Sequence, residues 1–291
     1  MAEIFEKDGT WAFDGGAIRI VPGRERGVHL LRQTLGEVVV PLTAVAGASF
    51  EPGRKGGRLR LRLRDGADPL LQAARGQLPD GADPYQLAID PSHAGVAEYF
   101  VDEVRTALLL EQVPDGPTDR YLLPGPAVPL SVTAGDGTVA FDGERISLEW
   151  NWKTEDDKKS AGRQSLPLPE VGSVEWQPSI GLENGYLRFL HPGQTARTPP
   201  KYDPHAIEFY GFKKDPLLAL VAAAVMARLP HPAAPAPATP AALTKGEAAS
   251  GAASDHDALL RRLRELGELH QAGVLTEEEF AAAKRAVLQR F

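Results

Sequence analysis

Apolar and polar side chains alternate with a period of two along several short segments of the chain. The clearest segment is Arg58–Arg64, in which arginines and leucines alternate, as expected for a strand with one buried face. The runs Thr10–Phe13 and Thr138–Phe141 each lead into an Asp-Gly pair, which suits a tight hairpin turn. Further strands are predicted at residues 37–42, 85–89, 165–168 and 206–210. The pattern therefore predicts a mainly β chain.

Two segments instead carry apolar residues at every fourth position, which is typical of a helix with one buried face. They are Val96–Val104 and Val221–Leu229. An Asp-Pro pair precedes each segment, beginning at Asp90 and at Asp215. Asp accepts hydrogen bonds from the free amides of a helix N-terminus, and Pro suits the first turn. A helix is therefore predicted after the last strand of each half.

The sequence also repeats itself. Residues 8–18, DGTWAFDGGAI, match residues 136–146, DGTVAFDGERI, at eight of eleven positions with an offset of 128. The Gly-x-Leu-Arg segment that begins at Gly57 recurs at Gly185 with the same offset. Self-similarity at a fixed spacing indicates a duplication. The predicted organisation is repeat one at 1–112, a Pro-rich linker at 113–130 and repeat two at 131–229.

Several short antiparallel strands followed by one C-terminal helix is the element order of a pleckstrin-homology-like (PH-like) barrel. We therefore expect an α+β, mainly β protein with two tandem PH-like barrels, each closed by its C-terminal helix. The alternative is a pair of α+β sandwiches with another topology.

The last part of the chain has a different composition. Residues 230–254 are rich in Pro and Ala and are predicted to form a disordered linker. Residues 255–291 are predicted to form a small helical hairpin, in which Gly273 ends the first helix and the capping box Thr276–Glu279 begins the second. Its apolar positions include Leu259, Leu263, Leu266, Phe280, Val287 and Leu288.

A hairpin of this length buries too little apolar surface to be stable alone. Its apolar face is therefore expected to contact another copy of the chain, a partner protein, or the chain's own barrels. The long Pro/Ala tether favours contact with another copy, because a docked hairpin needs no flexible connection.

The pattern L-x-x-L-x-x-L-x-x-x-G-V-L-T-E-E-E-F-x-x-x-K, from Leu263 to Lys284, resembles the SHOCT module, a short C-terminal domain of bacterial proteins. The two repeats resemble a family of duplicated domains of unknown function from high-GC Gram-positive bacteria, often joined to this module. The resemblance implies a PH-like fold and an oligomerising or partner-recruiting role for the C-terminus. It brings no catalytic residues with it.

Composition narrows the function classes. The 291 residues include no cysteine, which excludes disulfides, thiolate nucleophiles and Cys-ligated metals. The net charge of −7 argues against the whole chain being a polyanion binder. The longest apolar run, Leu217–Ala227, is shorter than the roughly 20 residues of a membrane span, and Met1–Thr10 does not have the composition of a signal peptide. We therefore expect a soluble, cytoplasmic protein without a transmembrane segment.

The chain carries no recognisable catalytic motif. No two of its seven histidines are three or four residues apart, and it has no HExxH, G-x-S-x-G, Walker or G-x-G-x-x-G motif. We therefore expect a protein that is not an enzyme and that needs no metal or cofactor.

The best candidate for a binding surface is the basic strand. Its outward arginines, spaced about 6.6 Å apart, suit the phosphate groups of lipid headgroups or nucleic acid. The alternative is a solvated strand face that nearby acids balance. Repeat two keeps only Arg188 on the equivalent strand, between Tyr186 and Leu190, so its outward face is predicted to be apolar. The basic residues in question are Arg58, Arg60, Arg62 and Arg64.

Three hypotheses follow for the function. The first is a non-enzymatic cytoplasmic scaffold that the C-terminal hairpin multimerises or recruits to protein partners. The second is a peripheral binder of anionic lipid or nucleic acid through the basic strand of repeat one. The third is an enzyme whose site is assembled only in the folded chain.

Overall fold

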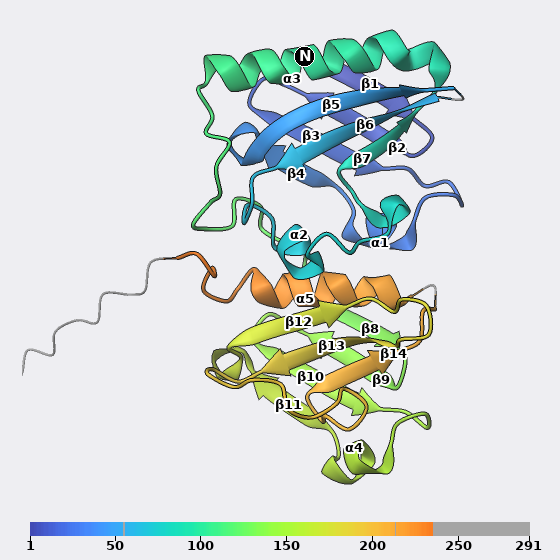
Figure 1. Cartoon of the computed structure of the whole chain (residues 1–291), viewed down its shortest axis with the longest axis vertical. Helices are drawn as coiled ribbons and strands as arrows, with labels where there is room; N and C mark the ends of the chain where they lie inside the picture. Colours follow the sequence, from blue (N-terminus) through green and yellow to red (C-terminus); the bar gives the residue numbers. More distant parts are fainter. Residues whose placement is uncertain (55, 213, 235–291) are drawn as a thin grey trace, which may run out of the picture. The chain divides into compact units, whose positions relative to one another are not determined.

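The computed structural model describes residues 1–54, 56–212 and 214–234. Within them the two halves of the chain repeat the same order of strands, and each half ends in a helix (Figure 1). Almost all of the predicted Pro/Ala linker and the whole predicted hairpin lie outside the described residues. This includes the six candidate hairpin residues Leu259, Leu263, Leu266, Phe280, Val287 and Leu288.

Repeat one contains two antiparallel sheets. The strands of the first, four-stranded sheet are β1 (Ala2–Glu6), β2 (Gly9–Phe13), β3 (Ala17–Pro22) and β4 (Val38–Pro41). The second sheet has three strands, β5 (Val45–Gly53), β6 (Gly56–Leu63) and β7 (Gln86–Ile89). The helices are α1 (Leu30–Leu35), α2 (Pro69–Ala74) and the C-terminal α3 (Ala94–Leu110).

Repeat two has the same order of strands and the same C-terminal helix, but its described residues contain no helix equivalent to α2. Its four-stranded sheet contains β8 (Leu130–Ala134), β9 (Gly137–Phe141), β10 (Arg145–Trp150) and β11 (Gln164–Pro167). Its three-stranded sheet contains β12 (Ser173–Gln177), β13 (Gly185–Leu190) and β14 (Ala206–Phe209). The helices are α4 (Asp156–Ala161) and the C-terminal α5 (Leu218–Met226).

This arrangement confirms a mainly β α+β chain with two similar halves, each made of antiparallel sheets and ending in a helix. No closed barrel is found in residues 1–234 outside the gaps, because the two sheets of each half remain separate hydrogen-bonded units. The prediction that each repeat is a closed barrel is therefore wrong for the described residues, because no strand pairing joins the two sheets of either half. Side chains, rather than a continuous ladder, join the two sheets across the core.

The core of repeat one lies between its two sheets and α3. Trp11 and Phe13 of β2 pack against Phe100 of α3, with ring centroids 6.1 and 6.4 Å apart. The buried face of α3 is made of Ala97, Phe100, Val101 and Val104. Val96, predicted to lie on this face, is instead exposed because it lies to the side of the stripe that these four residues form.

The helix α5 is buried nearly all round. Every residue from Leu218 to Val225 is buried, since α5 covers the sheets of repeat two on one side and contacts α2 of repeat one on the other. This double contact explains the uniformly apolar run that the sequence shows here. The predicted capping role of Asp215 is wrong: its carboxylate accepts hydrogen bonds from the amides of Tyr210 and Phe212, which precede it.

Each repeat has a buried cation on a short helix. In repeat two, Lys158 of α4 is fully buried, and its Nζ lies 2.6 Å from Asp136 Oδ2 and 2.8 Å from the carbonyl oxygen of Ala206. In repeat one, Arg32 of α1 is buried and its guanidinium contacts Asp8. The charged neighbours Asp156, Asp157 and Lys159 favour a solvated loop, but the structure shows a helix with one buried lysine.

Candidate anion-binding site

The strand β6 has the two faces that its alternation predicts. Leu59, Leu61 and Leu63 are buried in the core of repeat one. Its arginines lie on the opposite face, and most of that face is at least partly accessible. The structure then separates these arginines by the partners that each one has.

Arg58, Arg62 and Arg64 have protein partners. Arg62 Nη2 donates a hydrogen bond of 3.4 Å to the carbonyl oxygen of Ala46. Arg58 Nη1 lies 3.1 Å from Asp80 Oδ2, and both side chains are exposed. Arg64 donates hydrogen bonds to the carbonyl oxygens of Thr43, Gly116 and Pro117. Arg64 therefore joins β6 to neighbouring loops, whereas Arg58 belongs to an exposed ion pair outside the cavity described next.

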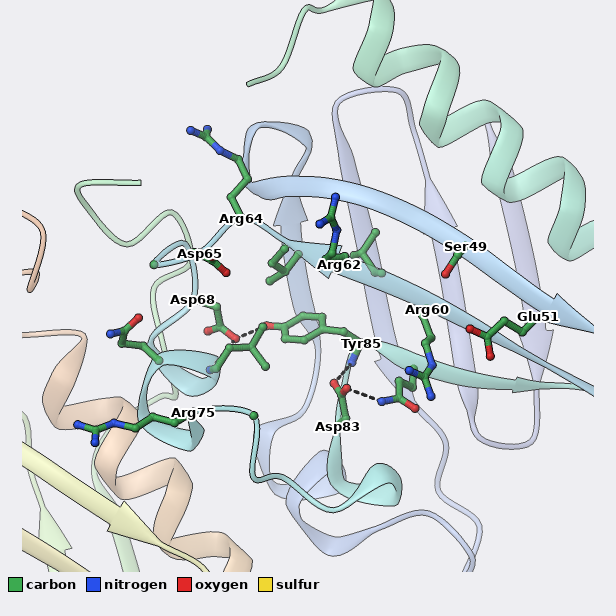
Figure 2. Close-up of a pocket in the computed structure, with 17 residues that line it drawn as sticks. Ser49, Glu51, Arg60, Arg62, Arg64, Asp65, Asp68, Arg75, Asp83 and Tyr85 are labelled. Atoms are coloured by element: carbon green, nitrogen blue, oxygen red, sulfur yellow. Dashed lines mark hydrogen bonds between the residues drawn. The ribbon is translucent and has the colours of Figure 1, made fainter. Parts of the chain in front are cut away.

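The face of β6 opens onto a cavity of about 670 Å³ between this strand, α2 and the segment that precedes β7. Figure 2 shows four guanidinium groups spread around it rather than converging on one point. They belong to Arg60, Arg62, Arg64 and Arg75. None of the four forms an ion pair with a carboxylate among the described residues.

Four acidic residues also line the cavity, and two of them are held by hydrogen bonds. Asp68 is buried and caps α2, because its carboxylate accepts hydrogen bonds from the backbone amides of Leu70 and Leu71. The same carboxylate accepts a hydrogen bond of 2.8 Å from the Tyr85 hydroxyl (Figure 2). Burial raises the pKa of Asp68 above its usual value. Burial and the neighbouring Asp68 raise the pKa of Tyr85 well above its usual value, so Tyr85 stays a hydroxyl donor. The other cavity acids are Glu51, Asp65 and Asp83.

The equivalent arginine of repeat two is neutralised. Arg188 occupies the place on β13 that Arg60 has on β6, but it is buried. Its Nε lies 3.0 Å from Asp203 Oδ2, and its Nη1 lies 3.6 Å from Glu175 Oε2. By contrast, Arg60 forms no ion pair with a carboxylate in the described part of the chain.

Two residue differences explain why Arg60 is not neutralised. On the neighbouring strand, Glu175 is directly opposite Arg188, whereas Ser49 is opposite Arg60. On the other side, Asp83 occupies the position of Asp203, but its Oδ2 accepts a hydrogen bond of 2.6 Å from Gln86 Nε2. Repeat two has Ala206 at the position of Gln86, and alanine cannot make this bond. Repeat one therefore leaves the Arg60 guanidinium without an ion-pair partner in an open cavity.

The outward face of β13 differs from its predicted apolar surface. Leu190 is buried at 9% exposure and Tyr186 is half-buried, with the Arg188 guanidinium 5.1 Å from the centre of the Tyr186 ring. Residues 197–203 cover this face, and the carbonyl of Thr198 accepts a hydrogen bond from Arg188. The sequence pattern could not reveal this cover because the covering segment has no regular period.

In the chain outside positions 55, 213 and 235–291, no group of three His, Asp or Glu side chains is placed to hold a metal ion. No helix of this described part is both long and apolar enough to cross a membrane.

The fold and the cavity together define a duplicated, mainly β α+β protein whose halves differ. Repeat one has an open cavity lined by arginines, whereas in repeat two the equivalent arginine, Arg188, is neutralised by carboxylates. The chain belongs to the DUF4429 family of domains of unknown function, whose family model matches residues 11–105 and 139–226. The Short C-terminal domain (SHOCT) model matches residues 261–288. These matches confirm both resemblances drawn from the sequence. No protein with a curated description matches the chain.

Proposed function

We propose that the protein is a non-catalytic binding protein that holds a phosphate-bearing ligand in the arginine-lined cavity of repeat one. The two repeats are PH-like domains in this proposal, an assignment that the four-plus-three strand plan and the C-terminal helix support. The SHOCT segment brings copies of the chain, or the chain and a protein partner, together. Joining several weak sites in this way raises avidity without new contacts.

The observation that carries the proposal is the environment of Arg60. A guanidinium that is partly removed from water and has no counter-charge gains free energy when an anion binds. Phosphate oxygens match the planar donor pattern of a guanidinium. Its counterpart Arg188 already has two carboxylates and offers no such gain.

The spread of the cationic groups indicates the size of the ligand. Alternate residues of a strand lie about 6.6 Å apart, so Arg60 and Arg62 form a pair that is spaced wider than one phosphate. A ligand with several phosphates, from a nucleic acid or a group of lipid headgroups, fits this pair better than a single ion.

Calorimetric titration of the full chain with inorganic tripolyphosphate tests the proposal. We expect binding that weakens as the salt concentration rises, because the contacts are ionic. Arg60→Ala is expected to weaken it about tenfold to hundredfold, the usual effect of losing a hydrogen-bonded charged group. Arg58→Ala is the matched control, since it removes the same charge from the same strand but outside the cavity.

Equal affinities of the two variants would refute the assignment of this cavity, and no binding by the wild type would refute the proposed function. Parallel titrations with a single-stranded DNA oligonucleotide and with phosphatidylglycerol vesicles identify the source of the phosphates. The source is the probe whose binding Arg60→Ala reduces and Arg58→Ala does not.

A further inference from the structure

Repeat two exposes four large apolar side chains on three loops. The loops are 151–154 after β10, 178–184 between β12 and β13, and 210–214 after β14. Trp152 is 83% exposed and Leu182 is fully exposed. Ile180 and Phe212 are each more than half exposed. We call Trp152, Ile180, Leu182 and Phe212 the apolar loop cluster.

Contacts between the loops show that they lie together. The Nζ of Lys153 is 5.5 Å from the ring centre of Trp152 and 5.3 Å from that of Phe212, so the first loop touches the third. A side chain built on Gly211 would contact Ser179, so the third loop touches the second. The second loop is a tight turn, with paired backbone bonds between Ile180 and Glu183. The four apolar side chains therefore belong to one end of repeat two.

Repeat one provides an internal comparison. The position of Trp152 corresponds to Arg24, 128 residues earlier, and the turn between β5 and β6 is much shorter than its counterpart at 178–184. In repeat one Asp90 follows β7 at once, whereas repeat two has the additional residues 210–214 before Asp215. The exposed apolar side chains thus lie in the segments by which repeat two differs from repeat one.

Such side chains are costly to expose, and a contiguous apolar group on a surface marks an interaction site. Loop tips that carry exposed apolar side chains can insert side by side into a lipid interface. Tryptophan favours that interface, and lysine stems extend through it toward the headgroups. The exposed cations Lys153 and Lys214 flank the cluster, and Glu183 is the single acid of these loops among the described residues.

We propose that the apolar loop cluster of repeat two inserts into the interfacial layer of an anionic lipid bilayer. This inference is independent of the cavity in repeat one, because it rests on different residues in the other half of the chain. The protein then lies on a membrane surface with the end of repeat two that carries these loops against the lipid.

The tryptophans of the chain give a direct readout. Trp11 and Trp176 are buried, and Trp150 is half-buried and donates its indole N–H to the carbonyl of Gly162. Trp152 is the exposed tryptophan of the four. Mixing the full chain with phosphatidylglycerol vesicles is expected to shift its fluorescence emission to shorter wavelengths. Trp152→Phe should abolish this shift and keep most of the binding, since it retains a large aromatic side chain.

Vesicle sedimentation then tests the contacts themselves. Trp152→Ala combined with Leu182→Ala is expected to weaken partitioning into phosphatidylglycerol vesicles at least about tenfold. Phe5→Ala is the matched control, because Phe5 is also exposed but lies on β1 of repeat one. Near-ultraviolet circular dichroism checks that each variant is folded.

Two results would overturn the proposal: an emission spectrum that vesicles do not change, or equal partitioning of the double variant and Phe5→Ala. Arg60→Ala distinguishes this site from the cavity. It should leave the emission shift in place even if it abolishes tripolyphosphate binding.

Discussion

Replacing the buried Lys158 by Met is expected to destabilise the folded chain by about 3–5 kcal/mol. The Nζ of Lys158 is fully buried and lies 2.6 Å from Asp136 Oδ2, 2.8 Å from the carbonyl oxygen of Ala206 and 5.2 Å from the centre of the Trp150 ring. Met fills nearly the same volume, so the change removes the charge and the donors rather than the packing. Asp136 is then left as a buried carboxylate with a hydrogen bond from the Glu208 amide but without its cation.

Urea unfolding followed by circular dichroism measures this change, and calorimetry should show a fall in Tm of about 6–20 °C. The matched control is Lys159→Met, since Lys159 is exposed and its pair with Asp156 is on the surface. That variant should stay within about 0.5 kcal/mol of the wild type. Adding Asp136→Asn to Lys158→Met should recover part of the loss, because the amide removes the unpaired charge. Equal stability of Lys158→Met and Lys159→Met would refute the reasoning.

Two further predictions concern Asp68 and the C-terminal segment. Because burial raises the pKa of Asp68, the folded state disfavours its carboxylate, and this cost is absent below the ordinary pKa of 3.8. The free energy of unfolding of the wild type should therefore fall relative to that of Asp68→Asn as the pH rises from below 3.8. Urea titrations in which the difference between the two proteins stays constant with pH would contradict this. If the SHOCT segment multimerises the chain, Leu263→Asp or Phe280→Asp should give a monomer in light scattering while the unfolding transition of residues 1–234 is kept. An oligomeric variant would place the interface elsewhere.

Local patterns in the sequence are sufficient to predict most of the strands. The alternation along Arg58–Arg64 depends only on neighbours two residues apart, and the structure confirms it as β6. The Asp-Gly turns after β2 and β9 are equally local, since Asp14 and Asp142 accept hydrogen bonds from amides two and three residues ahead. These hydrogen bonds lower the pKa of both carboxyl groups.

Features that depend on distant residues could not be predicted in this way. The charged neighbours of Lys158 in the sequence favour a solvated side chain. Its burial depends instead on Asp136, 22 residues earlier, and Ala206, 48 residues later. The one available signal is that Asp8 and Asp136 occupy equivalent positions in the duplication. The short helices α1 and α2 also have too few residues to show a period.

The sequence predicts only part of the candidate site, because the rest depends on contacts between distant residues. The alternation identified the basic face of β6, but it could not separate Arg58, which is paired with Asp80, from Arg60, which is not. Arg75 also lines the cavity and comes from the end of α2, outside the alternating segment. Comparing the two repeats position by position at Ser49 and Glu175 would have given the missing signal.

The most direct test of the central claim is to restore the missing counter-charge without removing an arginine. Ser49→Glu places a carboxylate opposite Arg60, as Glu175 is placed opposite Arg188. Ser49→Gln is the matched control, with the same size and no charge. In tripolyphosphate titrations, we predict that Ser49→Glu weakens binding at least about tenfold and that Ser49→Gln stays close to the wild type. Equal affinity of the two variants would contradict the claim that an un-neutralised Arg60 is what binds the anion.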